Sequence, residues 1–297
     1  MSNNHSHPQV NSLSRLLVAI FINSGIVIFE IILGVITGSM ALVSDAVHNI
    51  SDISAMVLGF WSEKISKRPA NKQKTYGYKK IEFITAFANS LFLSVAIIFV
   101  FYEAVMRFFQ PVVVASDKMF FVALIALIGN SIATIILQKT ANQNFNLKAV
   151  WLHSLQDALL SLGVVIASVI IYFTEWNIVD PLVSIIICLL IAREIYKIFS
   201  QTVNALLDSV PEGIDFNEVK SEILKNKNIK EIADLHIWQA SSHDKILSAH
   251  LRILPDANAQ KIIESVKNIL HEKYDIDHTT LQIVSFNEPL ANCTHCN

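Results

Sequence analysis

Six stretches of this chain are apolar over a length that matches a lipid bilayer, and short polar connections separate them. A helix rises about 1.5 Å per residue, so roughly 20 apolar residues cross the hydrocarbon core. The pattern predicts six transmembrane helices, at residues 14–37, 41–61, 81–102, 118–138, 149–173 and 180–200. Six crossings place both termini on the same side of the membrane.

The connection at residues 62–80 contains seven Lys or Arg residues and one acid, Glu63. Basic residues gather in the cytoplasmic loops of membrane proteins. The connections expected on the opposite side have no such excess of basic residues. The sequence therefore predicts that this connection and both termini are cytoplasmic.

The pattern changes near Asp208, where charged and apolar residues begin to alternate. Five segments with the period of helices or strands follow. They are helix 214–225, strand 231–240, strand 245–254, helix 258–274 and strand 279–285. This order predicts a small sheet with helices on one face, a ferredoxin-like α+β domain.

The chain is thus expected to be an α-helical membrane protein with a soluble domain after its helices. We divide it into a cytoplasmic N-terminal tail, a six-helix transmembrane domain, a cytoplasmic ferredoxin-like domain and a C-terminal tail, at residues 1–13, 14–209, 210–287 and 288–297.

Composition supports the membrane assignment. Of the 297 residues, 53% are hydrophobic and 16% are charged, and the mean hydropathy is +0.46. The lipid bilayer is therefore the expected surrounding. A net charge of −2 gives no basic field, so nucleic acid is not an expected partner. Short loops and the lack of a targeting extension favour a bacterial plasma (inner) membrane.

Two of the apolar stretches contain the spacing His-x-x-x-Asp, as His48 with Asp52 and as His153 with Asp157. Residues four apart project from one face of a helix. The helical rise places His48 and Asp52 on the order of 10 to 17 Å from the outer face. It places His153 and Asp157 on the order of 6 to 12 Å from the inner face, so the two pairs occupy adjoining depths near the middle of the membrane. An isolated pair fits a helix-packing hydrogen bond equally well, but the repeated spacing favours a shared site. Two imidazole nitrogens and two carboxylate oxygens suit tetrahedral Zn²⁺, with Cd²⁺ and Co²⁺ as further candidates.

Such a site favours transport over catalysis. Four protein ligands close a tetrahedral coordination sphere, whereas a hydrolytic zinc centre keeps one position open for water. Metal binding also needs neutral histidines and ionised aspartates, so metal and protons compete for the same side chains. We therefore predict a transporter that exchanges metal for H⁺, and not an enzyme. The alternative is a membrane metal sensor that does not transport.

Other polar residues also lie inside the apolar stretches. Glu30 must pair, take up a proton or line a wet path, which makes it a candidate for a proton or ion path. Asp45 lies one turn before His48 and either passes ions on or hydrogen-bonds a helix end. Single asparagines in membrane helices are expected to form interhelical hydrogen bonds, here Asn23, Asn89 and Asn130.

Taken together, these motifs resemble the cation diffusion facilitator family, the zinc-type, proton-coupled metal exporters. The resemblance covers nearly the whole chain. It rests on the residues from Ser44 to Asp52, on Thr75-Tyr76-Gly77-Tyr78, on His153-Ser154-Leu155-Gln156-Asp157, on Asp234-Leu235-His236-Ile237-Trp238 and on Ser248-Ala249-His250. It implies a homodimeric antiporter that works by alternating access, with the two His-x-x-x-Asp pairs as its transport site. His at position 48, in place of Asp, is associated with zinc selectivity.

The resemblance also implies cytoplasmic metal sites. In the family, the soluble domain can bind zinc through histidines that correspond to His236 and His250, with an acid on the last strand. Val284 stands where that acid is expected.

Cys293 and Cys296 form a C-x-x-C pair that suits zinc in a reducing compartment. Some relatives complete such a pair with an N-terminal histidine, here His5 or His7. The alternative is a disordered tail with two reduced thiols. The His-rich loop of some relatives is absent, because residues 139–148 contain no histidine.

Overall fold

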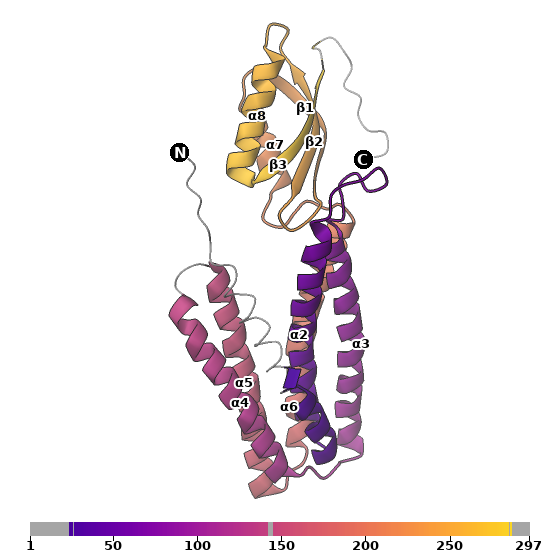
Figure 1. Cartoon of the computed structure of the whole chain (residues 1–297), viewed down its shortest axis with the longest axis vertical. Helices are drawn as coiled ribbons and strands as arrows, with labels where there is room; N and C mark the ends of the chain where they lie inside the picture. The colour runs from indigo at the N-terminus through magenta and orange to yellow at the C-terminus, as the bar shows by residue number, and fades with distance from the viewer. Residues whose placement is uncertain (1–23, 26, 142–144, 285, 287–297) are drawn as a thin grey trace. The chain divides into compact units, whose positions relative to one another are not determined.

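The computed structural model describes residues 24–25, 27–141, 145–284 and 286. An apolar helical segment, Val27–Thr37, comes first. Five long helices follow, which are α2 (Met40–Ser66), α3 (Ile81–Phe109), α4 (Ser116–Ala141), α5 (Phe145–Thr174) and α6 (Val179–Leu206). The last part of the chain contains α7 (Phe216–Leu224), β1 (Ile229–Gln239), β2 (Lys245–Ile253), α8 (Ala259–Tyr274) and β3 (Ile276–Val284), as Figure 1 shows.

The helices cover the expected apolar stretches as far as these are described, and all five long helices run further, most of all α2, α3 and α6 at their C-terminal ends. α2 continues to Ser66, α3 to Phe109 and α6 to Leu206. Hydropathy marks the part of a helix that suits hydrocarbon, whereas backbone hydrogen bonds continue into the polar sequence beyond it. By length and composition, two described segments, Ile81–Phe109 and Trp151–Thr174, could each cross a membrane. The number of six crossings stays a prediction.

The chain divides into two compact units. The first contains residues 1–57 and 89–196, and the second contains residues 58–88 and 197–297. α2, α3 and α6 therefore contribute residues to both units.

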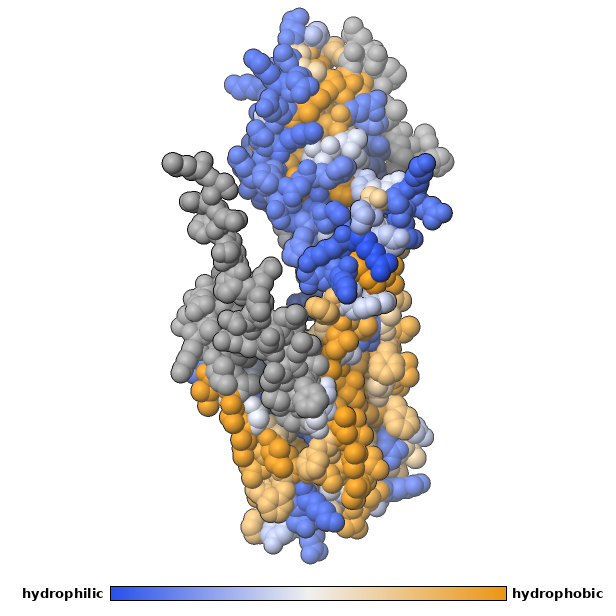
Figure 2. All heavy atoms as spheres, in the orientation of Figure 1, coloured by the Kyte–Doolittle hydropathy of each residue, from blue (hydrophilic) through white to orange (hydrophobic). Residues whose placement is uncertain are grey.

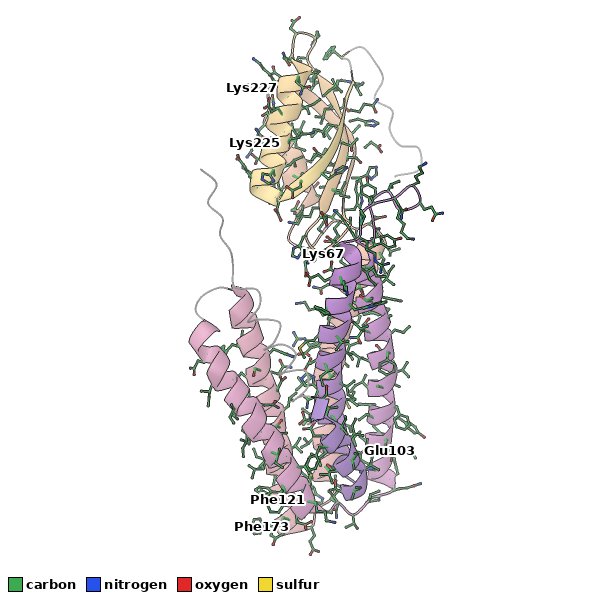
Figure 3. The ribbon with its side chains drawn as sticks, viewed as in Figure 1. Lys67, Glu103, Phe121, Phe173, Lys225 and Lys227 are labelled. Atoms are coloured by element: carbon green, nitrogen blue, oxygen red, sulfur yellow. The ribbon has the colours of Figure 1, made fainter. Side chains whose placement is uncertain are left out.

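The first unit is apolar inside and outside. Its core includes Leu42, Met119 and Val164, all of which are fully buried. Its surface also carries large apolar side chains, among them Phe121 and Phe173, which are 65% and 79% exposed and are labelled in Figure 3. Hydrophobic residues cover much of the visible surface of the long helices in Figure 2. An exposed apolar surface of this extent suits contact with lipid.

A buried carboxylate from the start of α6 caps the N-terminus of α2. Asp180 is fully buried and accepts hydrogen bonds from Ser39 Oγ at 2.5 Å, from the Met40 backbone N–H at 2.7 Å and from the Ala41 N–H at 3.2 Å. The Arg107 guanidinium lies 3.8 Å from the same carboxylate. These partners compensate the cost of burying the charge, and they hold the beginnings of α2 and α6 together.

Two of the three asparagines form interhelical hydrogen bonds, as the sequence predicted. Ser54 Oγ donates to Asn89 Oδ1 at 2.8 Å, which joins α2 to α3. Asn130 Nδ2 donates to Ser161 Oγ at 3.1 Å, which joins α4 to α5. Asn23 lies outside the described residues.

The second unit contains a three-stranded sheet with the strand order β1-β2-β3. β1 and β2 are antiparallel, and β2 and β3 are parallel. Helices α7 and α8 cover one face of the sheet (Figure 1), where Val219 and Val266 pack on Leu247 and Leu251. This confirms the predicted order of helices and strands.

The strand boundaries differ from the prediction by up to three residues, and the largest difference is at the start of β3. β3 begins at Ile276 and not at residue 279, because buried Ile276 already pairs with Lys245 of β2. The exposed Asp277 and His278 interrupt the apolar pattern at this point, so the pattern does not indicate where the strand begins.

Candidate metal centre

The four side chains of the two His-x-x-x-Asp pairs meet in the first unit. His48 and Asp52 lie one turn apart on α2, and His153 and Asp157 lie one turn apart on α5. The rest of both helices is largely apolar, so the polar face of each helix lies against the polar face of the other.

The contacts between the helices pair each histidine with the aspartate of the other helix. His48 Nε2 lies 3.0 Å from Asp157 Oδ1, and His153 Nε2 lies 3.2 Å from Asp52 Oδ1. Within α2, His48 Nε2 is 3.9 Å from Asp52 Oδ2. The two imidazole rings meet edge to face, with 5.9 Å between their centroids.

This reciprocal pairing follows from antiparallel helices. Each helix carries the histidine four residues before the aspartate, so the order of the two groups is reversed where the helices run in opposite directions. Two identical short motifs thereby form two complementary contacts. Each carboxylate lies beside a partner that can share a proton with it, which lowers the cost of burial in an apolar unit.

The site is buried at one end and open at the other. The side chain of His48 is 1% exposed and that of Asp157 is 16% exposed. Asp52 and His153 are 25% and 44% exposed. The Asp52–His153 pair is therefore the accessible end of the site, and the His48–Asp157 pair is the enclosed end.

The donor atoms converge closely enough to share one ion. Potential ligand atoms of His48, Asp52 and Asp157 lie within 4.8 Å of one another. Among the residues that the structure describes, this is the single group of three such side chains. The His153 nitrogen lies beside the same Asp52 carboxylate. Two carboxylates balance the charge of a divalent cation, and imidazole nitrogens favour zinc-like metals over Mg²⁺ or Ca²⁺.

Asp45 and Glu30 lie close to this group on the helix of His48 and on the preceding segment. Asp45 accepts a hydrogen bond from Ser161 Oγ at 3.2 Å, and Glu30 accepts one from Asn49 Nδ2 at 3.0 Å. Both carboxylates are 1% exposed, and each has one oxygen without a hydrogen-bond partner among the described residues. Their unused oxygens keep both residues as candidates for an ion or proton path.

The two cytoplasmic histidines lie on the face of the sheet opposite the helices. Asp234 lies between them, with Oδ1 at 3.0 Å from His236 Nε2 and Oδ2 at 3.9 Å from His250 Nε2. Asp234 has a positive φ of 51°, at a register shift between β1 and β2. Val284 stands on β3 where the acid is expected, and it pairs with Arg252 of β2 in the sheet register.

Sequence reasoning missed two of the residues described here. The motif in the sequence includes Asp234 but does not identify it as a partner of the histidines, although residues two apart on a strand share a face. The sequence does not indicate that Asp180 caps α2, because its backbone partners lie about 140 positions earlier. The tail residues His5, His7, Cys293 and Cys296 lie outside the described residues.

Comparison with known proteins gives matches over nearly the whole chain. The family model described as the cation efflux transmembrane domain matches residues 16–207, and the model for the cytoplasmic domain of cation efflux proteins matches residues 211–285.

Curated relatives are similar over almost their full lengths. The chain is 34% identical to the metal cation efflux system protein CzcD of Cupriavidus metallidurans, over 94% of this chain and 88% of that protein. It is 30% identical to the zinc transporter ZitB of Pectobacterium atrosepticum, over 95% and 89%. It is 31% identical to the cadmium, cobalt and zinc/H(+)-K(+) antiporter of Bacillus subtilis, over 94% and 91%.

The two family models together account for both the helical part and the sheet part of the chain. The relatives match across the boundary between these parts, so the arrangement of domains along the chain is shared as well. The chain therefore belongs to the cation efflux family, the cation diffusion facilitators, and is a multi-pass membrane protein with a cytoplasmic C-terminal domain.

Proposed function

We propose that this protein exports Zn²⁺ from the cytoplasm in exchange for protons, by alternating access, with His48, Asp52, His153 and Asp157 as the transport site. Cd²⁺ and Co²⁺ are further substrates. The relatives support this proposal through their names, which specify zinc, or cadmium, cobalt and zinc, and in one case an H(+)-K(+) antiporter. The sensor alternative gains no support, because these relatives are named as transporters.

The main structural support for the proposal is the reciprocal arrangement of the two His–Asp pairs. A nitrogen and a carboxylate oxygen 3.0 Å apart repel each other unless a proton lies between them. We expect each pair to hold, in the absence of metal, one proton beyond that of a neutral imidazole, because the charge of its carboxylate would otherwise stay uncompensated in an apolar unit. A metal ion that binds the same nitrogens and oxygens must displace both protons, so we expect two H⁺ to leave for each divalent ion.

This exchange conserves the charge of the site. Two aspartates with two shared protons are neutral, and two ionised aspartates with one divalent ion are also neutral. Neither state leaves a net charge inside an apolar unit, where an unpaired charge is costly. The site can therefore change its orientation with either cargo, and a state that holds neither protons nor metal is disfavoured.

The exposure of the two pairs gives the direction of loading. Asp52 and His153 form the accessible pair, and they lie toward the C-terminal end of α2 and the N-terminal end of α5. With the connection at residues 62–80 in the cytoplasm, as the charge bias predicts, metal enters from the cytoplasm past His153. It then meets the enclosed His48–Asp157 pair, and Asp45 and Glu30 provide the path beyond.

We further propose six membrane crossings, a plasma-membrane location with both termini in the cytoplasm, and a homodimer. The cytoplasmic domain binds metal through His236 and His250, with Asp234 in place of the missing acid of the last strand. Cys293 and Cys296, completed by His5 or His7, form a further capture site. These sites adjust transport to the concentration of cytoplasmic metal.

The test is metal flux into proteoliposomes that contain a zinc dye and, separately, a pH dye. We expect zinc entry coupled to proton movement in the opposite direction, and we expect Asp157→Asn to lower both fluxes at least about a hundredfold. Asp117→Asn, which removes an exposed carboxylate at the start of α4, is the matched control and should leave both fluxes unchanged. Zinc binding without any flux in the unmodified protein would overturn the transport proposal.

A further inference from the structure

The cytoplasmic connection between α2 and α3 has a surplus of positive charge that the fold does not neutralise. Three of its seven basic residues pair with acids in the structure, namely Lys67 with Glu63 at 2.6 Å, Lys79 with Asp244 at 2.5 Å and Lys80 with Asp208 at 2.6 Å. The other four form no ion pair with an acid among the described residues and are exposed, namely Lys64, Arg68, Lys72 and Lys74.

Two of these four cations converge on one aromatic ring. Lys74 Nζ lies 5.3 Å from the centroid of the Tyr78 ring, and Arg68 Cζ lies 6.0 Å from the same centroid. A ring attracts each cation, but it does not remove the repulsion between two like charges. An anion that lies between them would remove it.

The loop that carries these residues is well defined by its own hydrogen bonds. Asn71 and Lys74 exchange two backbone hydrogen bonds, at 3.1 and 3.2 Å, and Asn71 Oδ1 accepts from the N–H groups of Gln73 and Lys74, both at 2.9 Å. Gly77 has a φ of +74°, which returns the chain toward α3, and a side chain there would meet the Arg68 carbonyl at 3.3 Å. The backbone that carries Lys74 is therefore defined before any ligand binds, and its Gly77 lies close to the Arg68 carbonyl.

A cavity of about 710 Å³ lies beside this loop. Its lining includes Arg68, Thr75, Tyr76 and Gly77 of the loop, and also three acids, Glu63, Glu82 and Asp244. All three acids already have partners, since Glu63 and Asp244 pair with lysines and Glu82 accepts a hydrogen bond from Ser242 Oγ at 2.7 Å. Arg68 is the lining cation without a carboxylate partner among the described residues.

The neighbouring helix surface has the character of a membrane interface. Phe60 and Trp61 are 51% and 54% exposed near the end of α2. Tryptophan is favoured at the level of the lipid headgroups. The helical rise places Lys64 only about 5 Å beyond Trp61 along the axis. Figure 3 labels Lys67 at this end of α2.

We propose that the α2–α3 connection binds the phosphate of an anionic phospholipid headgroup between Arg68 and Lys74, with Lys64 and Lys72 as flanking charges. Clusters of basic residues directly beyond a membrane helix attract anionic lipid. The guanidinium supplies paired donors to phosphate oxygens, and the ammonium supplies a point charge. Lys79 of the same connection pairs with Asp244 beside β2, so the bound lipid also stabilises a loop that contacts the cytoplasmic sheet domain.

The test is native mass spectrometry of the full-length protein in detergent, with dioleoylphosphatidylglycerol and dioleoylphosphatidylcholine added in equal amounts. We expect a preference for the anionic lipid, and we expect Arg68→Gln with Lys74→Gln to lower it about tenfold or more. Arg68→Lys with Lys74→Arg keeps both charges and should keep most of the preference. The matched control is Lys227→Gln with Lys230→Gln, which removes two exposed charges elsewhere in the same unit and should leave the preference unchanged.

Three results would overturn the proposal. The first is an equal affinity of the unmodified protein for both lipids. The second is an equal loss of preference in the control pair, which would indicate attraction by net charge alone. The third is displacement of the lipid by inorganic phosphate at millimolar concentration, which would assign the site to free phosphate. The assay measures lipid and not metal, so its outcome is independent of the proposed transport.

Discussion

The membrane unit and the cytoplasmic sheet domain use the same residue types for two different arrangements. In the membrane unit, two histidines and two aspartates form reciprocal pairs, and three of their ligand atoms lie within 4.8 Å of one another. In the sheet domain, a single carboxylate, that of Asp234, lies between two partly exposed histidines at 3.0 and 3.9 Å. The first group balances the charge of a divalent ion, and the second does not.

The difference shows how much about function can be inferred from a polar residue, depending on whether it is buried in an apolar unit or lies on an open surface. A charge in an apolar unit must be paired or neutralised, so the polar residues of the helices have few alternatives to a shared site. On the open face of a sheet, water satisfies the same groups at little cost. A polar residue in the membrane unit must therefore have a partner, as Asp180 has in helix packing and the two His–Asp pairs have in each other. Polar residues on the sheet can be satisfied by water, so their role needs an independent measurement.

The largest effect should separate the two regions. His48→Ala should lower zinc flux about a hundredfold, because it removes an enclosed side chain of the proposed transport site and leaves Asp157 without its partner. The equivalent change His236→Ala should alter the maximum flux less than about twofold, because water can replace a partly exposed histidine. Proteoliposome flux at saturating zinc measures both. A similar loss in both variants would break the distinction between the two regions.

A second comparison lies within the membrane site. His153→Ala should weaken zinc binding about tenfold, less than His48→Ala does, since His153 is 44% exposed and water can take its ligand position. Equilibrium titration of the full-length protein with zinc gives both affinities. Equal losses would contradict the assignment of an open and an enclosed pair.

A smaller effect is expected at Ser161, which contacts Asp45 and belongs to neither of the two His–Asp pairs. Ser161→Ala removes the hydrogen bond to Asp45 and also the acceptor of the bond from Asn130, and the loss of each such bond corresponds to about a three- to tenfold change in a rate or an equilibrium. Zinc flux should fall by this factor while zinc affinity at His48 stays unchanged. Ser168→Ala, which alters a serine of the same helix bonded only to the Val165 carbonyl in the structure, is the control.

The smallest effect concerns pH and the sheet domain. Partial burial alone would raise the pKa of Asp244, but hydrogen bonds from Lys79 and Ser241 and the charge of Lys79 outweigh it and hold this pKa below its ordinary value. The stabilisation is therefore present above the unfolded pKa of about 3.9, and it is lost as the pH falls through the lower folded value.

Asp244→Asn should accordingly lower the free energy of unfolding by less than about 1 kcal/mol at neutral pH, since the pair is partly exposed. Thermal unfolding of the full-length protein from pH 7 to pH 3 checks this, and the difference from the unmodified protein should shrink in acid. Asp256→Asn, at an exposed turn, is the matched control. A difference that grows on acidification would show that the sign is wrong.

Much of this arrangement can be predicted from the sequence, for identifiable reasons. The spacing of His48 to Asp52 and of His153 to Asp157 predicts two polar helix faces that contact each other. Six alternating crossings would make α2 and α5 antiparallel, but the sequence does not say how far the two helices are shifted along each other, and this shift decides which histidine contacts which aspartate. The exposed fractions that distinguish His48 from His153 also come from packing alone.

Other features could not be predicted because their partners are distant in sequence or follow no period. The carboxylate of Asp180 is bonded to backbone groups that lie about 140 positions earlier, at the start of α2. Asp234 reaches both cytoplasmic histidines from a left-handed backbone conformation at an irregularity in the sheet. The helix end at Ser66 lies beyond the apolar stretch that predicted α2, since hydropathy does not report where a helix stops.

The central claim is that one divalent ion replaces two protons at the reciprocal His–Asp pairs. The most direct measurement is the number of protons released per bound Zn²⁺, from calorimetric titration in buffers of different ionisation enthalpy. The protein should carry His236→Ala, His250→Ala, Cys293→Ser and Cys296→Ser, so that the cytoplasmic candidates do not contribute. Release of about two protons per ion near neutral pH, with one ion bound per chain and loss of binding in Asp157→Asn, is the predicted result. Binding of one ion without proton release, or binding unchanged by Asp157→Asn, would contradict the account.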